Sequence, residues 1–384
     1  MTDRLNKIAF ISYDFPEYSI RHANEMADHA QVLLLLPEQT SREYLSLLDP
    51  RVRFEPFHKP RLRQPARQIV NALRLVRAVH SFGPDVVHVQ NGHMYFNLAM
   101  PLIRKFPLVI TIHDVRQHLG DSESGHTPQR IMDFGFRRAD QVIVHGLSMV
   151  DTVIDEIGFS QEQIHVIPHI ALGELDSPQP ISDNAQTILF FGRIWEYKGL
   201  EYLIRAAPKV HAEFPEVKFV IAGRGEDMQR YRELMHDPDA FVVLNDWISD
   251  QHRAQLFASC SMVVLPYTEA SQSGVTPIAY AYEKPVIVTR SGGLPDMVDH
   301  EQTGLLIPPR DVDALADAML QLLRDPTARV EMGRAGKRKL LQECAPTVVV
   351  AKTLDVYRQA IAERQAARPS ASTDGKAGAR MTGQ

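Results

Sequence analysis

The sequence predicts an α/β protein built from two parallel β-sheets. Short runs of apolar and β-branched residues recur along the 384-residue chain, and they alternate with segments whose apolar residues follow helical spacing. Runs that are apolar on both faces and separated by helices are typical of buried parallel sheets with right-handed crossovers. The chain is about twice as long as an ordinary single domain, so we expect two sheets, each in its own domain.

The expected strands fall into two groups along the chain. In the first half they cover residues 8–13, 32–36, 86–89, 108–112, 141–144 and 164–167. In the second half they cover residues 188–191, 218–222, 242–244, 262–265, 286–289 and 304–307. Helices are expected between them, among others over residues 67–80, 200–211, 251–258 and 312–323.

A break in composition separates the two groups. Residues 171–186 are polar, contain two prolines and lack periodicity, as is typical of an interdomain linker. We therefore expect an N-terminal domain over residues 1–170 and a C-terminal domain over residues 187–345. The remaining chain divides into an apolar-striped crossover helix over residues 346–366 and a Ser/Ala/Gly/Arg-rich tail over residues 367–384 that is expected to be disordered.

Composition excludes several functional classes. A hydrophobic content of 44% with 23% charged residues is that of a soluble globular protein, and the net charge of −5 argues against nucleic acid as a partner. The two cysteines, Cys260 and Cys344, are too few for a disulfide framework or a cysteine-based metal site. No segment resembles a signal peptide or a membrane span. We expect a cytoplasmic protein, either soluble or bound peripherally at the inner face of the membrane.

One segment, residues 51–77, is strongly basic. It contains eight Lys or Arg residues and a single acidic residue, Glu55. A helix over residues 64–80 would place Ile69, Leu73 and Val76 on one side and Arg67, Arg74 and Arg77 largely elsewhere. Two interpretations remain open: a surface helix that packs its apolar side on the sheet, or a basic surface that contacts an anionic membrane or a lipid-linked acceptor.

The first candidate site is the turn that follows the expected strand 188–191. It places Arg193 and Lys198 between Gly192 and Gly199, just before a helix begins at Leu200. Arginine offers a rigid bidentate fork and lysine a compact charge, which suits a doubly charged phosphate group. The alternative is a solvated surface loop in which neither cation binds a ligand.

The second candidate site is the loop over residues 266–275, after the expected strand 262–265. A helix is expected to begin near Ser273 and Gly274, where exposed backbone N–H groups can bind an anion and the glycine allows close approach. Glu269, just before it, can accept hydrogen bonds from sugar hydroxyls. The alternative is that Ser271 or Ser273 merely caps the helix. Both loops leave the carboxyl ends of strands, where open α/β sheets bind ligands, so together they would bracket a diphosphate.

Five motifs in the second half resemble glycosyltransferase family 4. They are GRIWEYKGL, IAGRGED, LPYTEASQSGV, KPVIVT and SGGLPDMV, and their order and spacing also match over residues 186–340. The first half resembles the family more loosely through IAFISY, DVVHVQ and ITIHD. The resemblance implies the GT-B fold, in which two Rossmann-like domains face each other across a cleft. It also implies retaining transfer from a nucleotide-sugar, without a metal ion or other cofactor.

The resemblance assigns roles residue by residue. Arg193 and Lys198 would hold the donor diphosphate and stabilise charge on the leaving group. Glu269 would orient the donor sugar, and His113 would reach it from the N-terminal domain, unless His113 is only a strand-end histidine bonded to its neighbours. The other expected donor-binding residues lie in the same loops or beside the nucleoside: Gly192, Gly223, Gln272, Ser273, Gly274 and Val275.

Two features depart from the family pattern. The family usually carries a second Glu eight positions after the first, where it holds the ribose, and this position falls on Pro277 or Ile278 depending on the anchor. The EASQSG arrangement is similar to that of one branch of the family, which favours a variant enzyme over an inactive one. The second departure is the expected first βα loop, residues 15–21, which lacks the glycines that many members place beside the acceptor.

We interpret the chain as a retaining, metal-independent hexosyltransferase of polysaccharide biosynthesis. It would move a sugar from a nucleotide-diphosphate donor to a saccharide or lipid-linked glycan. A non-catalytic glycan-binding protein and a nucleotide-sugar hydrolase or epimerase remain as alternatives. The acid pairs at 237–239 and 311–313 look like metal-binding DxD motifs but are better explained as a loop and as the start of a helix, so no metal site is expected.

Overall fold

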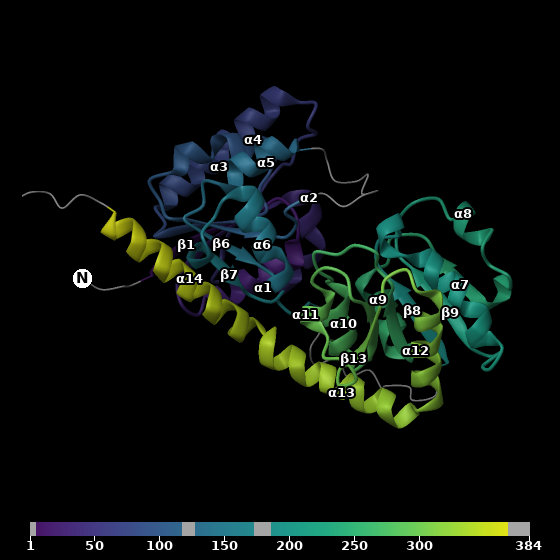
Figure 1. The fold of residues 1–384 in the computed structure, drawn as a ribbon. Coiled ribbons are helices and arrows are strands. Elements are labelled where there is room, and N and C mark those ends of the chain that lie inside the picture. Colours follow the sequence, from purple (N-terminus) through teal and green to yellow (C-terminus); the bar gives the residue numbers. More distant parts are fainter. Residues whose placement is uncertain (1–4, 117–126, 173–185, 368–384) are drawn as a thin grey trace, which may run out of the picture.

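The computed structural model describes residues 5–116, 127–172 and 186–367. It contains two parallel β-sheets (Figure 1). The first sheet has seven strands in the order β3-β2-β1-β4-β5-β6-β7, and the second has six in the order β10-β9-β8-β11-β12-β13. Helices cover both sheets, and the sheets lie beside each other (Figure 1). The predicted α/β class is therefore confirmed.

The strands match the expected runs closely. In the first sheet they are β1 Lys7–Ser12, β2 Gln31–Pro37, β3 Arg53–Phe57, β4 Val86–Gln90, β5 Leu108–Ile112, β6 Gln141–Val144 and β7 Ile164–Val166. In the second they are β8 Thr187–Phe191, β9 Lys218–Ala222, β10 Phe241–Leu244, β11 Met262–Leu265, β12 Val286–Thr289 and β13 Gly304–Ile307. Only β3 was not expected, because this edge strand carries a proline and charged residues instead of a buried run.

The helices follow the strands in alternation. In the first half they are α1 Pro16–Met26, α2 Glu38–Ser41, α3 Pro65–Phe82, α4 Met94–Ala99, α5 Gln129–Phe136 and α6 Val150–Thr152. In the second half they are α7 Leu200–His211, α8 Gln229–Arg232, α9 Asp250–Ser259, α10 Val275–Ala281, α11 Leu294–Met297, α12 Val312–Arg324, α13 Pro326–Glu343 and α14 Pro346–Ala366. The short 3-10 helices η2 (Met100–Ile103) and η6 (Glu196–Lys198) matter for the surfaces described below.

Most of the expected first βα loop is helical, so that prediction was wrong. Only Phe15 adopts a left-handed conformation, with φ of 58°, and α1 begins immediately at Pro16. Proline is well suited to the first helical position because its φ is already fixed near the helical value and its missing N–H is not needed there. The helix therefore starts where the sequence pattern suggested a loop.

The buried face of α3 also differs from the expectation. Ile69 and Leu73 are exposed, whereas Ala72, Leu75 and Val79 are buried against the sheet together with the expected Val76. This helix carries apolar residues on two sides, so helical spacing alone could not decide which side the sheet would bury. The outer side is left apolar as well as basic.

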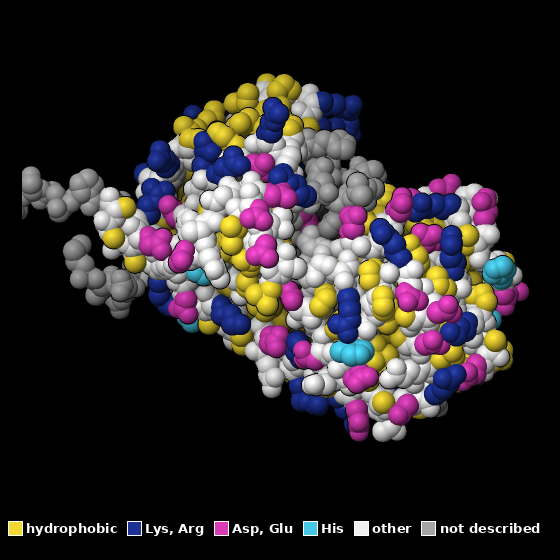
Figure 2. Space-filling view, viewed as in Figure 1, with side chains coloured by type: hydrophobic (Ala, Val, Ile, Leu, Met, Phe, Trp, Pro, Cys, Tyr) yellow, Lys and Arg dark blue, Asp and Glu magenta, His cyan; other side chains and the backbone are white. Residues whose placement is uncertain are grey.

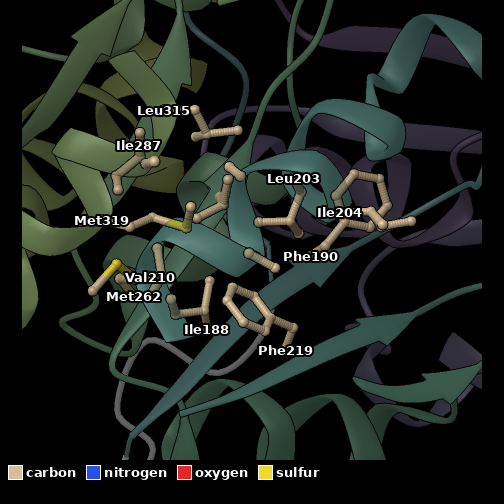
Figure 3. Close-up of a cluster of buried hydrophobic side chains, with 14 of the residues drawn as sticks. Ile188, Phe190, Leu203, Ile204, Val210, Phe219, Met262, Ile287, Leu315 and Met319 are labelled. Atoms are coloured by element: carbon tan, nitrogen blue, oxygen red, sulfur yellow. The ribbon is translucent and has the colours of Figure 1, made fainter. Parts of the chain in front are cut away.

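The core of the second half lies between its sheet and the helices α7 and α12. Figure 3 shows Ile188, Phe190 and Phe219 from the strands meeting Leu203, Ile204 and Val210 of α7 and Leu315 and Met319 of α12. These side chains are fully or almost fully removed from water, so burial of apolar surface stabilises the packing of this sheet against its helices.

The last helix, α14, returns to the first sheet. Val349, Val350 and Leu354 are buried in the apolar cluster that also holds β1 and β2 side chains. The Oη of Tyr357, in the same helix, lies 2.5 Å from Nδ1 of His88 in β4. Figure 1 shows this helix running along the first sheet after α13.

Some expectations fall on residues outside the described ranges. Most of the expected linker, at 173–185, and the expected tail from residue 368 lie there. Among the helices that the structure describes, none is both long enough and apolar enough to cross a membrane.

Candidate functional site

The two candidate loops meet at the point where the strand order of the second sheet reverses. β8 pairs with β11 at this point, while β9 and β10 lie on one side and β12 and β13 on the other. Loops leaving the carboxyl ends of two such strands diverge and open a crevice between them, which is where open α/β sheets bind ligands. Residues 192–199 follow β8 and residues 266–274 follow β11, so topology alone places both loops at one crevice.

Close backbone contact joins the two loops. The Thr268 N–H donates to the carbonyl oxygen of Tyr197 over 2.8 Å. Gly199 has φ of 67°, and a Cβ at this position would lie 2.0 Å from the carbonyl oxygen of Pro266. Only glycine combines that conformation with so close an approach.

Aromatic rings hold the two cations of the first loop. Nζ of Lys198 lies 3.8 Å from the ring centroid of Tyr267 and 4.8 Å from that of Tyr197. Arg193 Nη2 donates to Tyr197 Oη over 3.2 Å, and its side chain reaches solvent. Burial raises the pKa of Tyr267, so its hydroxyl stays uncharged. Positive charge is thus positioned at the crevice by two tyrosine rings.

The start of α10 faces the same crevice. Ser273 is buried, and its Oγ accepts from the Val275 N–H over 3.2 Å, so this serine binds the first N–H of the helix from the position before the N-cap residue, Gly274. A Cβ added to Gly274 would meet no atom within 4 Å, whereas one added to Gly192 would lie 3.5 Å from Val275 Cγ2. The backbone at Gly274 therefore borders open space, next to the loop that carries the cations.

The turn after β9 closes another side of the crevice. Gly223 has φ of 140°, and a Cβ there would lie 2.0 Å from the carbonyl oxygen of Gly192. Asn245, just after β10, accepts from the Gly225 N–H over 3.1 Å. Trp247, two residues further, is largely exposed. The sequence-based site did not include Asn245 or Trp247, although each follows the carboxyl end of an expected strand.

Glu269 lies in a hollow of about 360 Å³ that both halves of the chain line. The second half contributes Glu269, Ala270, Ser271, Ser291 and Gly292, and the first contributes Val115, Arg116, Ser148, Met149 and Thr152. The Ser271 hydroxyl donates to the carboxylate of Asp114. Asp114 is the second residue after β5 and follows His113. The carboxyl ends of the two sheets therefore face each other across this hollow.

His113 is buried at the end of β5, close to that contact. Its Nε2 lies 2.6 Å from Gln90 Oε1, and its ring stacks on Phe15 at 4.1 Å between centroids. An amide oxygen can only accept, so Nε2 carries the proton. Burial, reinforced by the neighbouring His145 and His169, holds the pKa of His113 well below its usual range. The imidazole is therefore neutral and bonded to its neighbours, beside the residue that contacts the Glu269 loop.

Gln272 points elsewhere. Its side chain lines a separate hollow of about 170 Å³ together with His145 and Thr276, and its Oε1 is buried without a hydrogen-bond partner among the described residues. Pro277 lines the same hollow, and Ile278 is buried in an apolar cluster. The two candidate positions for a ribose-binding carboxylate therefore hold apolar side chains.

The DxD-like pairs serve local structure. Asp311 accepts from the Ala314 N–H over 2.9 Å and caps α12, and Asp237 accepts from the Asp239 N–H over 3.2 Å. Over residues 5–116, 127–172 and 186–367, no group of three or more His, Cys, Asp or Glu side chains is arranged to hold a metal ion.

Two family models match the chain. One is described as glycosyltransferase family 4 and matches residues 18–170; the other is described as glycosyl transferases group 1 and matches residues 185–325. Together they cover both halves of the molecule, including the loops at the crevice.

Three relatives show which glycosyltransferases the sequence is similar to. An uncharacterized glycosyltransferase of Methanocaldococcus jannaschii is 31% identical over 304 residues, covering 72% of this chain and 76% of the relative. A glycogen synthase of Mycobacterium tuberculosis is 26% identical over 304 residues, covering 72% and 69%. A GDP-mannose-dependent phosphatidylinositol monomannoside mannosyltransferase of the same species is 28% identical over 190 residues, covering 45% and 47%.

Solved structures share the fold over nearly the whole chain. A sucrose-phosphate synthase from Thermosynechococcus elongatus has a TM-score of 0.72 at 19% identity, covering 93% of this chain and 100% of that one. The Anabaena protein HepE, in complex with UDP and glucose, has a TM-score of 0.71 at 19% identity, covering 92% and 100%.

Proposed function

The chain is a glycosyltransferase that belongs to family 4 and has the GT-B fold, and from this premise we propose that it transfers a hexose from a nucleotide-diphosphate sugar to a hydroxyl group. The acceptor in this proposal is a saccharide or a lipid-linked glycan, and the anomeric configuration is retained. The reaction takes place in the cytoplasm, at the inner face of the membrane when the acceptor is lipid-linked.

The observation that carries the proposal is the meeting of two loops where the second sheet reverses its strand order. Arg193 and Lys198 come from one loop, and the open backbone at Gly274 comes from the other. A diphosphate in the crevice would receive both positive side chains and the N–H groups of residues 273–275, of which the Val275 N–H would exchange its bond to Ser273 Oγ for one to the phosphate. These groups would stabilise the negative charge that appears on the leaving diphosphate, and they would supply the positive charge without a metal ion.

The sugar would lie in the hollow beside Glu269. A carboxylate accepts hydrogen bonds from sugar hydroxyls and so fixes the ring relative to the diphosphate. In the reaction the bond from C1 to the phosphate oxygen breaks and the bond from C1 to the acceptor oxygen forms on the same face. The acceptor proton passes to the departing phosphate oxygen, which is the base on that face.

His113 acts in this scheme as a neutral group. Because its imidazole is uncharged and its Nε2 proton is bound to Gln90, it does not supply a positive charge to the diphosphate. It supports the strand end at which Asp114 meets Ser271, and through that contact it shapes the wall of the sugar hollow.

Donor binding and donor turnover test the proposal together. Thermal stabilisation of the full chain is measured with UDP-, GDP- and ADP-sugars, for wild type and for Arg193→Ala. Ligand that binds only the folded state raises the melting temperature by mass action. We expect a shift with one nucleotide class that Arg193→Ala abolishes, and no shift in any class would contradict the diphosphate site.

Turnover then separates transfer from hydrolysis. With the donor found in the binding experiment, the release of free nucleotide is followed with and without a panel of saccharide and lipid-linked acceptors. A transferase releases nucleotide mainly when the acceptor is present. Equal release without acceptor would identify a nucleotide-sugar hydrolase instead.

A further inference from the structure

The outer side of α3 and the neighbouring α4–η2 segment form an exposed aliphatic surface. On α3 it consists of Ile69, Val70 and Leu73, which are 51%, 67% and 40% exposed. On α4 and η2 it continues with Leu98 and Leu102, which are 49% and 52% exposed. We call these five residues and the basic residues around them the α3–η2 face. Large aliphatic side chains grouped in this way usually mark an interaction surface.

The two segments of this face are adjacent. Nε2 of His80, in the last turn of α3, lies 2.9 Å from the carbonyl oxygen of Leu102 in η2. Figure 2 shows hydrophobic side chains gathered at the top of the view, over α3 and α4, with Lys and Arg side chains among them. The aliphatic residues therefore belong to one surface.

Charge on this part of the chain has one sign. Residues 56–113 contain eight Lys or Arg residues and one acidic residue, Asp85. The carboxylate of Asp85 accepts from the backbone N–H groups of Asn6 and Lys7 at the start of β1, so it is engaged there. The cations are Lys59, Arg61, Arg63, Arg67, Arg74, Arg77, Arg104 and Lys105. A chain with a net charge of −5 thus concentrates positive charge in one place.

Most of these cations have no acidic partner. Lys59 pairs with Asp14, but no ion pair within the described ranges involves Arg67, Arg74, Arg77 or Arg104. Arg67 and Arg74 emerge beside Val70 on the outside of α3, and Arg104 follows Leu102 at the end of η2. Aliphatic side chains at the centre with unpaired cations around them match a surface whose outside is anionic and whose inside is hydrocarbon.

We propose that the α3–η2 face rests on an anionic lipid bilayer. The aliphatic side chains would enter the boundary between headgroups and acyl chains, while the arginines bind lipid phosphates. A protein partner would also cover apolar residues, but Arg67, Arg74 and Arg104, which flank the aliphatic side chains without an ion pair among the described residues, need an anionic counterpart on more than one side of the face. A bilayer rich in anionic lipid provides this at every position. The inference deepens the membrane location given in the proposed function by naming the surface that binds the bilayer, and it does not depend on the transfer reaction itself.

The position of the α3–η2 face relative to the cleft would bring the bilayer close to the acceptor side of the site. A basic hollow of about 410 Å³ at the start of α3 is lined by His58, Lys59, Arg61 and Arg67. It also touches Pro37, the last residue of β2, and so lies at the carboxyl edge of the first sheet, which faces the Glu269 hollow. A bilayer on the α3–η2 face would therefore lie next to the entrance for an acceptor.

Vesicle co-sedimentation of the full chain tests the proposal. Vesicles of phosphatidylcholine alone are compared with vesicles that contain phosphatidylglycerol. Two triple variants are used, Arg67→Gln/Arg74→Gln/Arg77→Gln and Ile69→Ser/Val70→Ser/Leu73→Ser. The control is Arg338→Gln/Leu341→Ser, which changes an exposed cation and an exposed leucine of α13. All of these side chains are exposed, so we expect melting temperatures and donor-induced shifts close to wild type.

We expect wild type and the control to bind the anionic vesicles and each triple variant to bind at least tenfold more weakly. Binding should also fall as salt is raised, since lipid phosphates and arginines are screened. Triple variants that bind as wild type does would overturn the proposal. The proposal would also be overturned if the wild-type protein did not bind the vesicles. In that case, a dimer that is seen by sedimentation velocity and abolished by the triple variants would assign the face to contact between two copies of the chain. Because the donor-induced shift is measured in the same variants, failure of the transfer proposal would be seen separately.

Discussion

The hydroxyl of Ser271 donates a hydrogen bond to the carboxylate of Asp114, joining the loop after β11 to the end of β5. A second bond of this kind runs from the Leu147 N–H to Asp296 Oδ2 over 2.7 Å, and Arg253 lies 3.9 Å from Glu17 across the same division. These contacts connect the two halves, and the first of them borders the hollow that holds Glu269. Any motion that separates the two halves must break them, so they stabilise the arrangement seen in this structure.

Ser271→Ala should therefore lower turnover more than it lowers donor affinity. Removing a hydrogen bond to a charged partner costs about 1.5–3 kcal/mol, so we expect kcat to fall roughly 10- to 100-fold if closure precedes transfer. Steady-state kinetics give the value, and small-angle scattering with donor reports closure. Ser259→Ala, which removes an exposed helical hydroxyl, should change neither. Wild-type kcat in Ser271→Ala would show that this bond does not assist closure.

Lys198→Ala should reduce transfer strongly without unfolding the protein. Its Nζ lies over the rings of Tyr267 and Tyr197 at the proposed diphosphate site, where loss of one stabilising charge would cost roughly 10²- to 10³-fold in kcat. Arg205→Ala, on the exposed side of α7, is the matched control and should retain activity. Transfer assays on both variants decide the point; equal activity would place the diphosphate elsewhere.

Two glycine substitutions should separate binding from stability. Gly274→Ala adds a methyl group to open space at φ of −69°, so the melting temperature should not change, but donor affinity should fall at least tenfold because the methyl group occupies the phosphate position. Gly223→Ala places a Cβ 2.0 Å from the Gly192 carbonyl oxygen at φ of 140°, and should destabilise the fold by about 1–3 kcal/mol. Melting curves and donor titrations of the pair give both quantities. A stable Gly274→Ala with wild-type donor affinity would contradict the phosphate position.

Glu269→Gln should discriminate between the sugar and the nucleotide. The carboxylate lies in the hollow between the two halves, whose lining does not include Arg193 or Lys198. We therefore expect the affinity of the variant for free nucleoside diphosphate to stay within about twofold of the wild-type value. The additional affinity that the attached sugar provides, which is a few kcal/mol at most for charged hydrogen bonds, should be largely lost. Calorimetric titration with nucleotide and nucleotide-sugar measures the difference. An equal loss for both ligands would assign Glu269 to the nucleotide.

Stability should fall steeply as the pH drops below neutrality. Burial lowers the pKa of His22 and His145 to about 3 and that of His169 to about 4, and these residues contact one another through Tyr18. In the unfolded chain each histidine regains a pKa near 6.5, so between about pH 6.5 and pH 4 the unfolded state binds more protons than the folded state. The free energy of unfolding should then decrease by about 1.4 kcal/mol per pH unit for each such histidine as the pH falls.

Urea unfolding between pH 7 and pH 5 measures that slope. His22→Asn should reduce this slope by an amount equal to the uptake of about one proton on unfolding, even if the variant is less stable than wild type at pH 7. His29→Asn, which changes an exposed histidine in the turn after the same helix, should leave the slope unchanged. A wild-type stability that is flat over this range would mean that the histidines are not buried as neutral groups.

The sequence was sufficient to predict the sheets because their strands are continuous apolar runs. It was not sufficient for α3, where Ile69 and Leu75 are equally apolar and only the position of the sheet decides that Leu75 is buried. The crevice loops could be predicted because Arg193, Lys198 and Gly274 lie next to strand ends. The partnership of Ser271 with Asp114 could not, because it spans 157 residues and depends on how the two sheets approach each other.

The return of α14 to the first sheet affects how the protein can be made. Tyr357, Val349 and Leu354 complete a core whose other members begin at Ile8, so the N-terminal half exposes apolar surface until the end of the chain has left the ribosome. Full burial of this surface therefore requires α14, which is synthesised after the whole second sheet. A fragment that ends after β7 would lack this cover, and supplying residues 346–366 as a separate peptide should restore it.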